Sequence, residues 1–317
     1  MAIIAPSRRL GPVFIYGRRC LWGLAALICP VILLANTDDS TDPNYRVGTS
    51  EVRITFFATD ENHHSVDTVT TDDFAVVDSG VVIREFRSLA HASETTLDIV
   101  ALVDASGSVE PRLKTSIHDV LKMASGRQVS ENDNFSVISF SGLRPELLCA
   151  DNCRSAMAGR RLEAVKAGGA TPLFDTLVFA SDFVSNRRAP GVRQVLILFS
   201  DGIDTISRVS AREALDAVVA SGALLYTVDL NKNGRDPRAS AFLRQIAEAT
   251  GGRAFSSEGS AGEVLEAALA DLRASYVVTY PLPNHLVGFH SLRIFPKHNL
   301  NLRFHCRSGY YYEKRIP

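Results

Sequence analysis

Two features that would indicate a nucleic-acid-binding protein or a repeat protein are missing from this sequence. Its 34 basic side chains are balanced by 35 acidic ones, so the formal net charge is −1 and no polyelectrolyte partner such as nucleic acid is implied. No internal repeat and no low-complexity segment is present. Apolar residues make up 46% of the 317 residues, so the chain can bury a sizeable core in one large domain or two.

The sequence also lacks the pattern of a serine hydrolase. It contains no Gly-x-Ser-x-Gly nucleophile elbow, and none of its eight histidines falls where a catalytic triad would need its base. His290, His298 and His305 match no helical or hairpin spacing of metal ligands, so we expect them to be solvated strand residues. We therefore expect a protein that is not an enzyme.

The N-terminus has the pattern of an export signal. Four arginines precede an uncharged apolar run from Cys20 to Ala35, after which the composition turns abruptly polar. The run is shorter than the about 20 apolar residues that a membrane span needs, so cleavage near Ala35 is favoured and a permanent anchor is the alternative. Residues 1–35 are then a signal, and we expect the mature chain outside the cytoplasm, touching a membrane only if the signal stays attached.

Few cysteines remain after this segment, namely Cys149, Cys153 and Cys306. Cys149 and Cys153 enclose a short loop, which in an oxidising compartment predicts a local disulfide bond. Two free thiols are the alternative reading of this pair. A zinc site would need further ligands at a matching spacing, and the neighbouring sequence has none.

Both ends of the mature chain show the alternation of β-strands. Within residues 45–92, Val52, Ile54 and Phe56 lie at every second position, and after Tyr276 three more strands are predicted. Neither flank can bury much apolar surface alone. We therefore predict that residues 276–317 pair with residues 45–92 in a small β-sandwich.

The segment between these flanks, residues 95–275, has the pattern of an α/β domain. Apolar runs alternate with amphipathic helices that carry end signals, such as Pro111 in the first turn of one helix and the capping box Ser210-Ala-Arg-Glu213 in another. This alternation predicts a Rossmann-like domain with a central, mainly parallel β-sheet and helices on both faces. The buried strands are expected at residues 97–103, 135–140, 194–199 and 223–228.

Oxygen-bearing side chains follow two of these predicted strands. The first strand ends in Asp104-Ala-Ser106-Gly-Ser108, a later one ends in Ser200-Asp201, and between them Gly168-Gly-Ala-Thr171 leads into a helix. Because open α/β sheets bind ligands at the carboxyl ends of their strands, we expect these side chains to meet at one edge. The expected site is Asp104, Ser106, Ser108, Thr171 and Asp201.

Two carboxylates and three hydroxyls without a histidine or thiolate suit a hard divalent cation, with Mg²⁺ first and Mn²⁺ or Ca²⁺ as alternatives. A cation held largely by hydroxyls and water retains electrophilic character, so we expect its last position to accept an Asp or Glu carboxylate from a partner protein. Taken singly, Asp104 or Asp201 could instead cap a helix or close a turn. Asp175 and Asp204 are expected to be structural in that way.

The order Asp104-x-Ser106-x-Ser108, then Thr171, then Asp201 resembles the metal-ion-dependent adhesion site of von Willebrand factor A and integrin I domains. The resemblance implies that the first four residues surround the cation and that Asp201 completes the shell through water. One position departs from the pattern. Many relatives have threonine immediately after the glycine pair, whereas Ala170 intervenes here.

The flanks extend the resemblance over nearly the whole mature chain. Residues 71–80, 275–280 and 307–311 look like the von Willebrand factor A-related proteins abundant in Acidobacteria, which implies an extracytoplasmic bacterial protein. The function we expect is divalent-cation-dependent binding of a protein partner. The alternative is a structural or assembly component of the cell envelope in which the metal site is non-functional or purely structural.

Overall fold

A computed structural model of the chain describes residues 46–47, 51–92, 96–126, 129–151, 153–231, 236–256 and 261–312. All of them belong to the unit Asp39–Pro317. The expected signal, residues 1–35, lies outside the described residues. No helix within the described part of the chain is long and apolar enough to cross a membrane.

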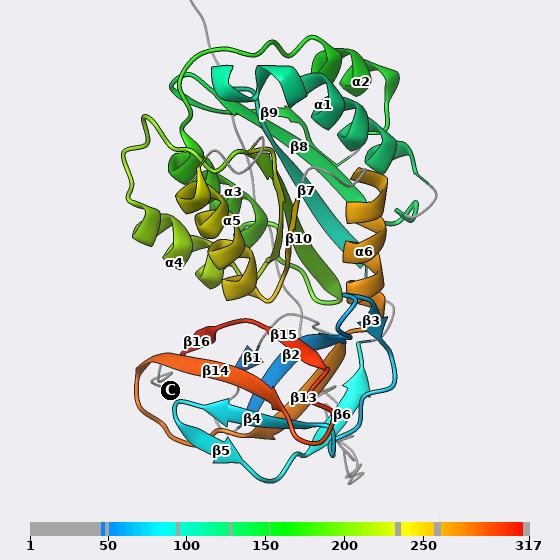
Figure 1. Cartoon of the computed structure of the whole chain (residues 1–317), viewed down its shortest axis with the longest axis vertical. Coiled ribbons are helices and arrows are strands. Elements are labelled where there is room, and N and C mark those ends of the chain that lie inside the picture. The colour runs from blue at the N-terminus through cyan, green and yellow to red at the C-terminus, as the bar shows by residue number, and fades with distance from the viewer. Residues whose placement is uncertain are drawn as a thin grey trace, which may run out of the picture. The chain divides into compact units, whose positions relative to one another are not determined.

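The middle of the chain forms a six-stranded sheet with the order β12-β11-β10-β7-β8-β9 (Figure 1). Neighbouring strands are parallel, except that β9 runs antiparallel to β8 at one edge. The strands are β7 (Thr96–Asp104), β8 (Asn134–Ser141), β9 (Arg144–Cys149), β10 (Val192–Ser200), β11 (Leu224–Asp229) and β12 (Ala254–Ser256).

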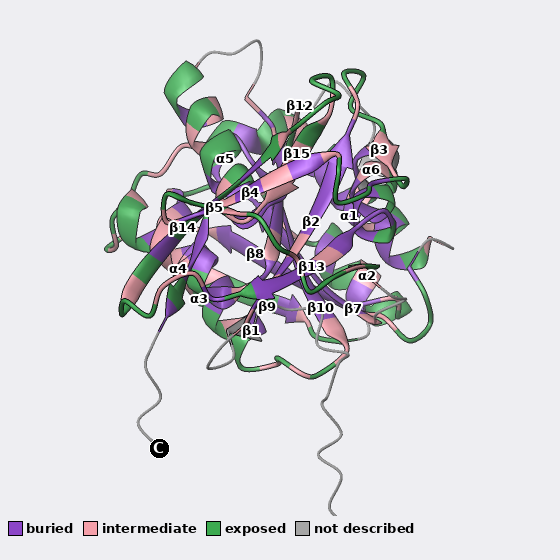
Figure 2. Cartoon of the chain, turned by 90° about the horizontal axis from the view of Figure 1, so that it is seen from below, coloured by how far each residue is buried: buried purple, intermediate pink, exposed green. Residues whose placement is uncertain are grey.

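Helices cover both faces of this sheet because successive residues of its strands point to opposite sides. On β7, Ile99 and Ala101 pack with helices α1, α2 and α6, whereas Val100 and Leu102 pack with α3, α4 and α5. Figure 2 shows the corresponding burial, with buried residues on the strands inside and exposed residues on the outer surfaces of the helices. The helices are α1 (Glu110–Ser125), α2 (Ala156–Glu163), α3 (Leu173–Ser185), α4 (Ala211–Ser221), α5 (Pro237–Thr250) and α6 (Ala261–Arg273). The predicted mainly parallel α/β fold is confirmed.

Local signals in the sequence place the ends of these helices. The capping box of α4 is present, with the Ser210 hydroxyl accepting from the backbone N–H of Glu213 and the Glu213 carboxylate accepting from the backbone N–H of Ser210. Gly222 ends the same helix with φ 76°, a left-handed conformation that costs glycine little. Pro111 lies in the first turn of α1, where no helical N–H is lost.

Both ends of the chain build a pair of antiparallel sheets below the α/β domain. One is six-stranded and the other four-stranded with the order β16-β14-β4-β5. The first contains β1 (Arg46–Val47), β2 (Glu51–Thr59), β3 (Ser65–Val66), β6 (Ser88–His91), β13 (Tyr276–Pro281) and β15 (Arg303–Cys306). The second contains β4 (Phe74–Asp78), β5 (Val81–Ile83), β14 (Gly288–Pro296) and β16 (Gly309–Tyr312).

Each of these sheets mixes strands from the two ends of the chain. In one, β13 pairs with β2, so Tyr276 lies opposite Phe56. In the other, β14 pairs with β4, so Ile294 lies opposite Val76. Side chains from both sheets share one buried apolar cluster, which confirms the sandwich predicted from the two flanks.

Two of the histidines that were expected to be solvated are not. His305 on β15 is half-buried, its ring stacks on Phe57, and its Nε2 lies 3.0 Å from the Thr59 hydroxyl. His290 was expected to be a solvated strand residue, but it is 2% exposed and lies between the sheets. Its ring stacks on Tyr310, and its Nδ1 lies 3.6 Å from the buried carboxylate of Asp78. A period-two pattern does not show which face of a strand another sheet covers. The sequence alone therefore does not show that the side chain of His290 points inwards.

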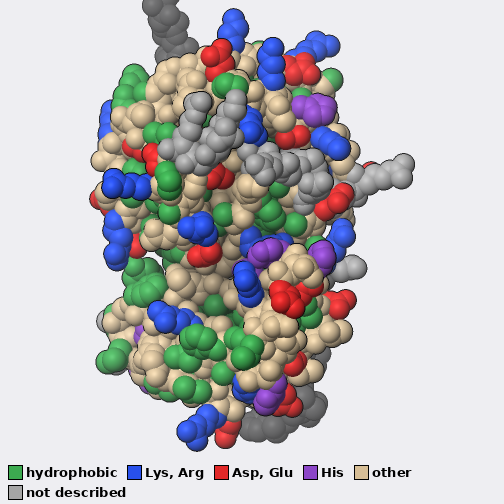
Figure 3. Space-filling model, in the orientation of Figure 1, with side chains coloured by type: hydrophobic (Ala, Val, Ile, Leu, Met, Phe, Trp, Pro, Cys, Tyr) green, Lys and Arg blue, Asp and Glu red, His purple; other side chains and the backbone are tan. Residues whose placement is uncertain are grey.

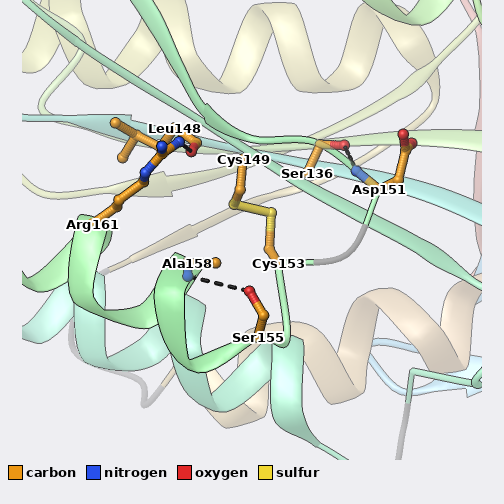
Figure 4. The surroundings of a disulfide bond; sticks show 8 residues. All are labelled: Ser136, Leu148, Cys149, Asp151, Cys153, Ser155, Ala158 and Arg161. Atoms are coloured by element: carbon orange, nitrogen blue, oxygen red, sulfur yellow. Dashed lines mark hydrogen bonds between the residues drawn. A yellow bond between two sulfur atoms is a disulfide. The ribbon is translucent and has the colours of Figure 1, made fainter.

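A disulfide bond joins Cys149 to Cys153 at the edge of the central sheet (Figure 4). Cys149 is the last residue of β9, and Ser155 caps α2 by accepting from the backbone N–H of Ala158 at 3.2 Å. The bridge therefore ties the antiparallel edge strand to the start of the next helix. Cys306 is a free thiol, and burial raises its pKa to about 12.

Candidate functional site

The five predicted site residues lie at the carboxyl-terminal edge of β7 and β10 and on the loop before α3. The parallel register of these strands places Phe199 opposite Val103, so Ser200 and Asp104 follow side by side where both strands end. Residue Asp201 comes directly after this point. The sheet thus brings its two site carboxylates to one edge, as the strand-end rule predicts.

Asp104 is held in place by two neutral donors. Its Oδ1 accepts from the backbone N–H of Ser106 at 2.9 Å, and its Oδ2 accepts from the Ser200 hydroxyl at 2.7 Å. The side chain has no exposed surface. Among the described residues, no lysine or arginine forms an ion pair with this carboxylate.

The two serines of the same loop bring a pair of hydroxyls to the edge. The Oγ atoms of Ser106 and Ser108, which flank Gly107 in the sequence, lie 3.2 Å apart. Ser106 is buried, whereas Ser108 is exposed at the start of the short helical turn Gly107–Val109. The two hydroxyl oxygens of this loop therefore lie between the buried carboxylate of Asp104 and the protein surface.

The loop that carries Thr171 packs against this serine loop. The backbone N–H of Gly168 donates to Ala105 O at 2.9 Å, and the N–H of Gly107 donates to Gly169 O at 3.3 Å. Gly168 and Gly169 have φ of 153° and 80°, values that favour glycine and explain the glycine pair. The extra Ala170 has its own place in this packing, because its carbonyl accepts from Gly142 N–H at 2.8 Å.

Thr171 is fixed from the other side by the loop after β10. Its backbone N–H donates to the Thr205 hydroxyl at 2.7 Å, and the Thr205 N–H donates back to Thr171 O at 3.0 Å. Thr171 is 3% exposed. The threonine thus remains within the set of loops at the edge despite the alanine that precedes it.

Asp201 completes the set and acts on Asp104 through its charge. Its Oδ1 accepts from the backbone N–H of Ile203 at 3.1 Å, which closes a tight turn. The pKa of Asp104 is raised to about 6, because burial and the negative charge of Asp201 raise it by more than the hydrogen bonds from Ser106 and Ser200 lower it. Two carboxylates so placed leave a local excess of negative charge that a cation would neutralise.

Three supporting residues were not among the predicted site residues. Ser200 binds Asp104, and Thr205 positions Thr171. Asp204 is structural as expected, because its Oδ1 accepts from the Ser207 hydroxyl at 2.5 Å and from Phe174 N–H at 3.3 Å. Of these three residues, only Ser200 could have been identified from the sequence. It directly precedes Asp201, and when two parallel strands end together this position falls beside Asp104.

The chemistry of the donor set fits a hard divalent cation. It consists of two carboxylates and three hydroxyls, with neither nitrogen nor sulfur. Among the described residues, no group of three or more His, Cys, Asp or Glu side chains is arranged so that it could hold a metal ion. A cation here would therefore depend on serine and threonine hydroxyls and on water as much as on carboxylates.

Comparisons with known proteins place the domain that carries this site. The profile of the von Willebrand factor type A domain matches residues 98–268. The magnesium-chelatase 67 kDa subunit of Chlorobaculum parvum is 26% identical over 226 residues, 64% of this chain and 33% of that protein. An uncharacterised protein of Mycobacterium tuberculosis is 29% identical over 157 residues, 45% of this chain and 24% of its own length. The chain thus spans a third or less of both curated relatives.

Among solved structures, the von Willebrand factor type A protein from Catenulispora acidiphila is similar, with a TM-score of 0.45 and 13% identity. The similarity covers 86% of this chain and 76% of that one. The profile match covers more than half of the 317 residues and includes all five residues of the candidate metal site. The chain therefore belongs to the von Willebrand factor type A domain family.

Proposed function

We propose that this chain is a protein-binding module that recognises its partner through a divalent cation. Asp104, Ser106, Ser108, Thr171 and Asp201 hold the cation, Mg²⁺ first and Mn²⁺ or Ca²⁺ as alternatives. A carboxylate from an Asp or Glu of the partner completes the site. The observation that carries the proposal is the fully buried Asp104, which has Asp201 beside it and only neutral hydrogen-bond donors around it.

The donor set favours recognition over catalysis. A Mg²⁺ ion bound here would supply a positive charge and an open position for an oxygen ligand. The chain's own hydroxyls contribute no negative charge, so they leave the ion strongly attractive to an external carboxylate. None of the hydrogen bonds within the site involves a histidine or lysine that could act as a general base. We therefore propose a binding protein and not an enzyme.

The proposed location is outside the cytoplasm. The arginines and the apolar run of residues 1–35 have the pattern of an export signal. The disulfide between Cys149 and Cys153 supports the same location, because such bonds persist mainly in oxidising compartments. Basic and acidic side chains are interspersed on the face shown in Figure 3, which fits a protein partner better than a nucleic acid.

A second candidate is a scaffold role through the β-sandwich. The outer face of the four-stranded sheet exposes Phe289, Phe295 and Tyr311, each by 45% or more. Phe289 and Tyr311 lie opposite each other on β14 and β16, with ring centroids 5.2 Å apart. Exposed aromatic side chains of this kind are common in protein contacts. Binding through this face would not depend on a cation.

Calorimetric titration of Mg²⁺ and Mn²⁺ into the metal-free chain from Asn36 tests the first proposal. We expect saturable binding to one site in the wild type, and loss of that heat in the Ser106→Ala/Ser108→Ala variant. Ser125→Ala is the matched control, because Ser125 is an exposed serine whose hydroxyl bonds only to its own helix. Binding that survives in the double serine variant would place the cation elsewhere and overturn the proposed site. Absence of any binding in the wild type would favour the scaffold role.

A further inference from the structure

A polar cavity lies next to the candidate metal site and takes no part in it. It has a volume of about 590 Å³ and is lined by residues of β8, β9 and α2 and of the turn after α2. We call it the β9 pocket and define it by Ser139, Ser141, Glu146, Arg161, Val165 and Lys166. None of these residues has a role in the interactions described above for the metal site.

The wall of the β9 pocket is continuous with the loop that carries Thr171. Ser141 is followed by Gly142, whose N–H donates to the carbonyl of Ala170 at 2.8 Å. The two backbones approach so closely that a Cβ on Gly169 would lie 3.1 Å from the nitrogen of Gly142. On the other side, Lys166 precedes Gly168 by only two residues. The loop that carries Thr171 and the wall of the β9 pocket are thus in direct backbone contact.

The side chains that line the β9 pocket carry a net positive charge, which favours an anionic ligand. It contains two cationic side chains, Arg161 and Lys166, and one carboxylate, Glu146. Neither cation forms an ion pair with Glu146 in the described part of the chain. Arg161 donates one hydrogen bond, from Nη1 to Leu148 O at 3.2 Å, and Lys166 makes none with the described residues. A guanidinium and an ammonium group thus remain available to a carboxylate ligand.

The disulfide holds this pocket in a defined shape. Leu148, whose carbonyl orients Arg161, directly precedes Cys149, and Cys149 is bonded to Cys153 ahead of α2 (Figure 4). The two walls of the pocket, β9 and α2, are therefore linked covalently and through Arg161. A preorganised pocket loses less entropy on binding than a mobile one.

We propose that the β9 pocket binds a second carboxylate of the same partner segment whose first carboxylate completes the metal site. The inference rests on the proposed function. The preferred partner is then a segment with two acidic side chains at a defined separation. Glu146 disfavours segments that are acidic at every position, because a carboxylate placed beside it would be repelled.

The test uses fluorescein-labelled synthetic peptides and the mature chain from Asn36 in saturating Mg²⁺, with fluorescence anisotropy as the readout. One peptide carries a single aspartate among glycines and serines. The others carry a glutamate as well, at increasing separations from the aspartate. We expect one separation to bind about fivefold more tightly than the single-aspartate peptide, as an added charge-assisted contact allows.

Variants show where this gain arises. Arg161→Ala and Lys166→Ala should each reduce the gain from the glutamate while leaving Mg²⁺ affinity and single-aspartate binding unchanged. Arg160→Ala is the matched control, because Arg160 is the exposed arginine next in sequence on the same helix and does not line the pocket. Lys166→Glu should turn the gain into a loss.

The outcomes separate the two proposals. If Mg²⁺ does not bind, or if EDTA does not release the single-aspartate peptide, the proposed function fails. If cation-dependent binding of that peptide is present but no separation improves it, the β9 pocket proposal alone is wrong. It is equally wrong if Arg160→Ala removes the gain as fully as Arg161→Ala does, since the effect then arises from general positive charge.

Discussion

Asp104 is an acidic side chain without exposed surface, and the metal-free chain offers it no cationic partner among the described residues. Burying a carboxylate in this way costs free energy, which is why its pKa is raised to about 6. A carboxyl with a pKa raised from about 4 to about 6 reduces the stability of the folded state by about 3 kcal/mol at neutral pH. At neutral pH this cost would be relieved by a cation bound at the proposed site.

Asp104→Asn tests this cost directly. The amide removes the buried charge but leaves a donor where an acceptor stood, so we expect the metal-free variant to be about 1–2 kcal/mol more stable than the metal-free wild type at pH 7.5. In the wild type, the unfolding free energy is free of this cost below about pH 4, where Asp104 is neutral in both the folded and the unfolded state. The cost develops as the pH rises through about 6. Near pH 4 the wild type regains about 3 kcal/mol and the variant does not, so the variant should be the less stable protein there by about 1–2 kcal/mol. Urea unfolding in EDTA at both pH values measures the difference.

Adding Mg²⁺ should reverse the order of stability. The wild type gains stability because the ion binds only its folded state, whereas the variant has lost a ligand. A variant that is less stable than the wild type in EDTA at pH 7.5 would show that the hydrogen bonds to Asp104 outweigh its desolvation.

At the same scale, the sequence was enough to predict that Asp104 and Asp201 lie at one edge of the sheet, because both follow directly from strand ends. The role of the five site residues as metal ligands stays a prediction. The sequence missed Ser200 and Thr205, whose roles depend on which neighbours the register and the loops bring to them. It was wrong about His290, because burial between two sheets is a property of the sandwich and not of the residue.

At the scale of elements, the edge strand β9 shows how the central sheet is completed. The predicted strands β7, β8, β10 and β11 are continuous apolar runs because both faces of each are covered. β9 has Pro145 near its start and several exposed residues, so its sequence did not indicate a strand. Its place comes from pairing with β8 and from the disulfide at its end.

Removing that disulfide should loosen the edge without unfolding the sheet. The bridge closes a short loop, so we expect Cys149→Ser/Cys153→Ser to lose about 2 kcal/mol of unfolding free energy. Because the metal-site loops are held by hydrogen bonds elsewhere, Mg²⁺ affinity should stay within about twofold of the wild type. Chemical denaturation and calorimetric titration of the double variant measure the two effects. A parallel loss of Mg²⁺ binding would show that β9 supports the metal site itself.

At the scale of the whole molecule, a buried ion pair links the α/β domain to the sandwich. Arg253, just before β12, donates from Nε and Nη2 to both carboxylate oxygens of Asp271 on α6, at 2.8 and 2.9 Å. The Ser65 hydroxyl on β3 also donates to Asp271, and Arg253 donates to the carbonyl of His63. Figure 1 shows α6 reaching down to β3 at this point. The two parts of the chain thus share one buried polar network.

We expect Asp271→Asn to destabilise the protein by about 3 kcal/mol or more, because it leaves the buried Arg253 without its counter-charge. The double variant Arg253→Met/Asp271→Leu should recover much of this loss, since apolar side chains of similar size remove both charges together. Differential scanning calorimetry of the wild type, of the single variants Arg253→Met and Asp271→Leu, and of the double variant gives the coupling energy. Additive losses would show that the two side chains do not act as a pair.

The sequence by itself determined the layout of this protein. The central strands are apolar runs because they are buried on both faces, and helix caps depend only on residues close in the sequence. The acidic and hydroxyl residues of the candidate site stand directly after strands or before a helix, so their positions can also be found from the sequence. Only the tertiary structure decided which strands of the two chain ends pair, the inward position of His290, the strand β9 and the pocket beside it. These depend on contacts between residues far apart in the sequence, and no local pattern encodes which distant surface a strand or side chain will meet.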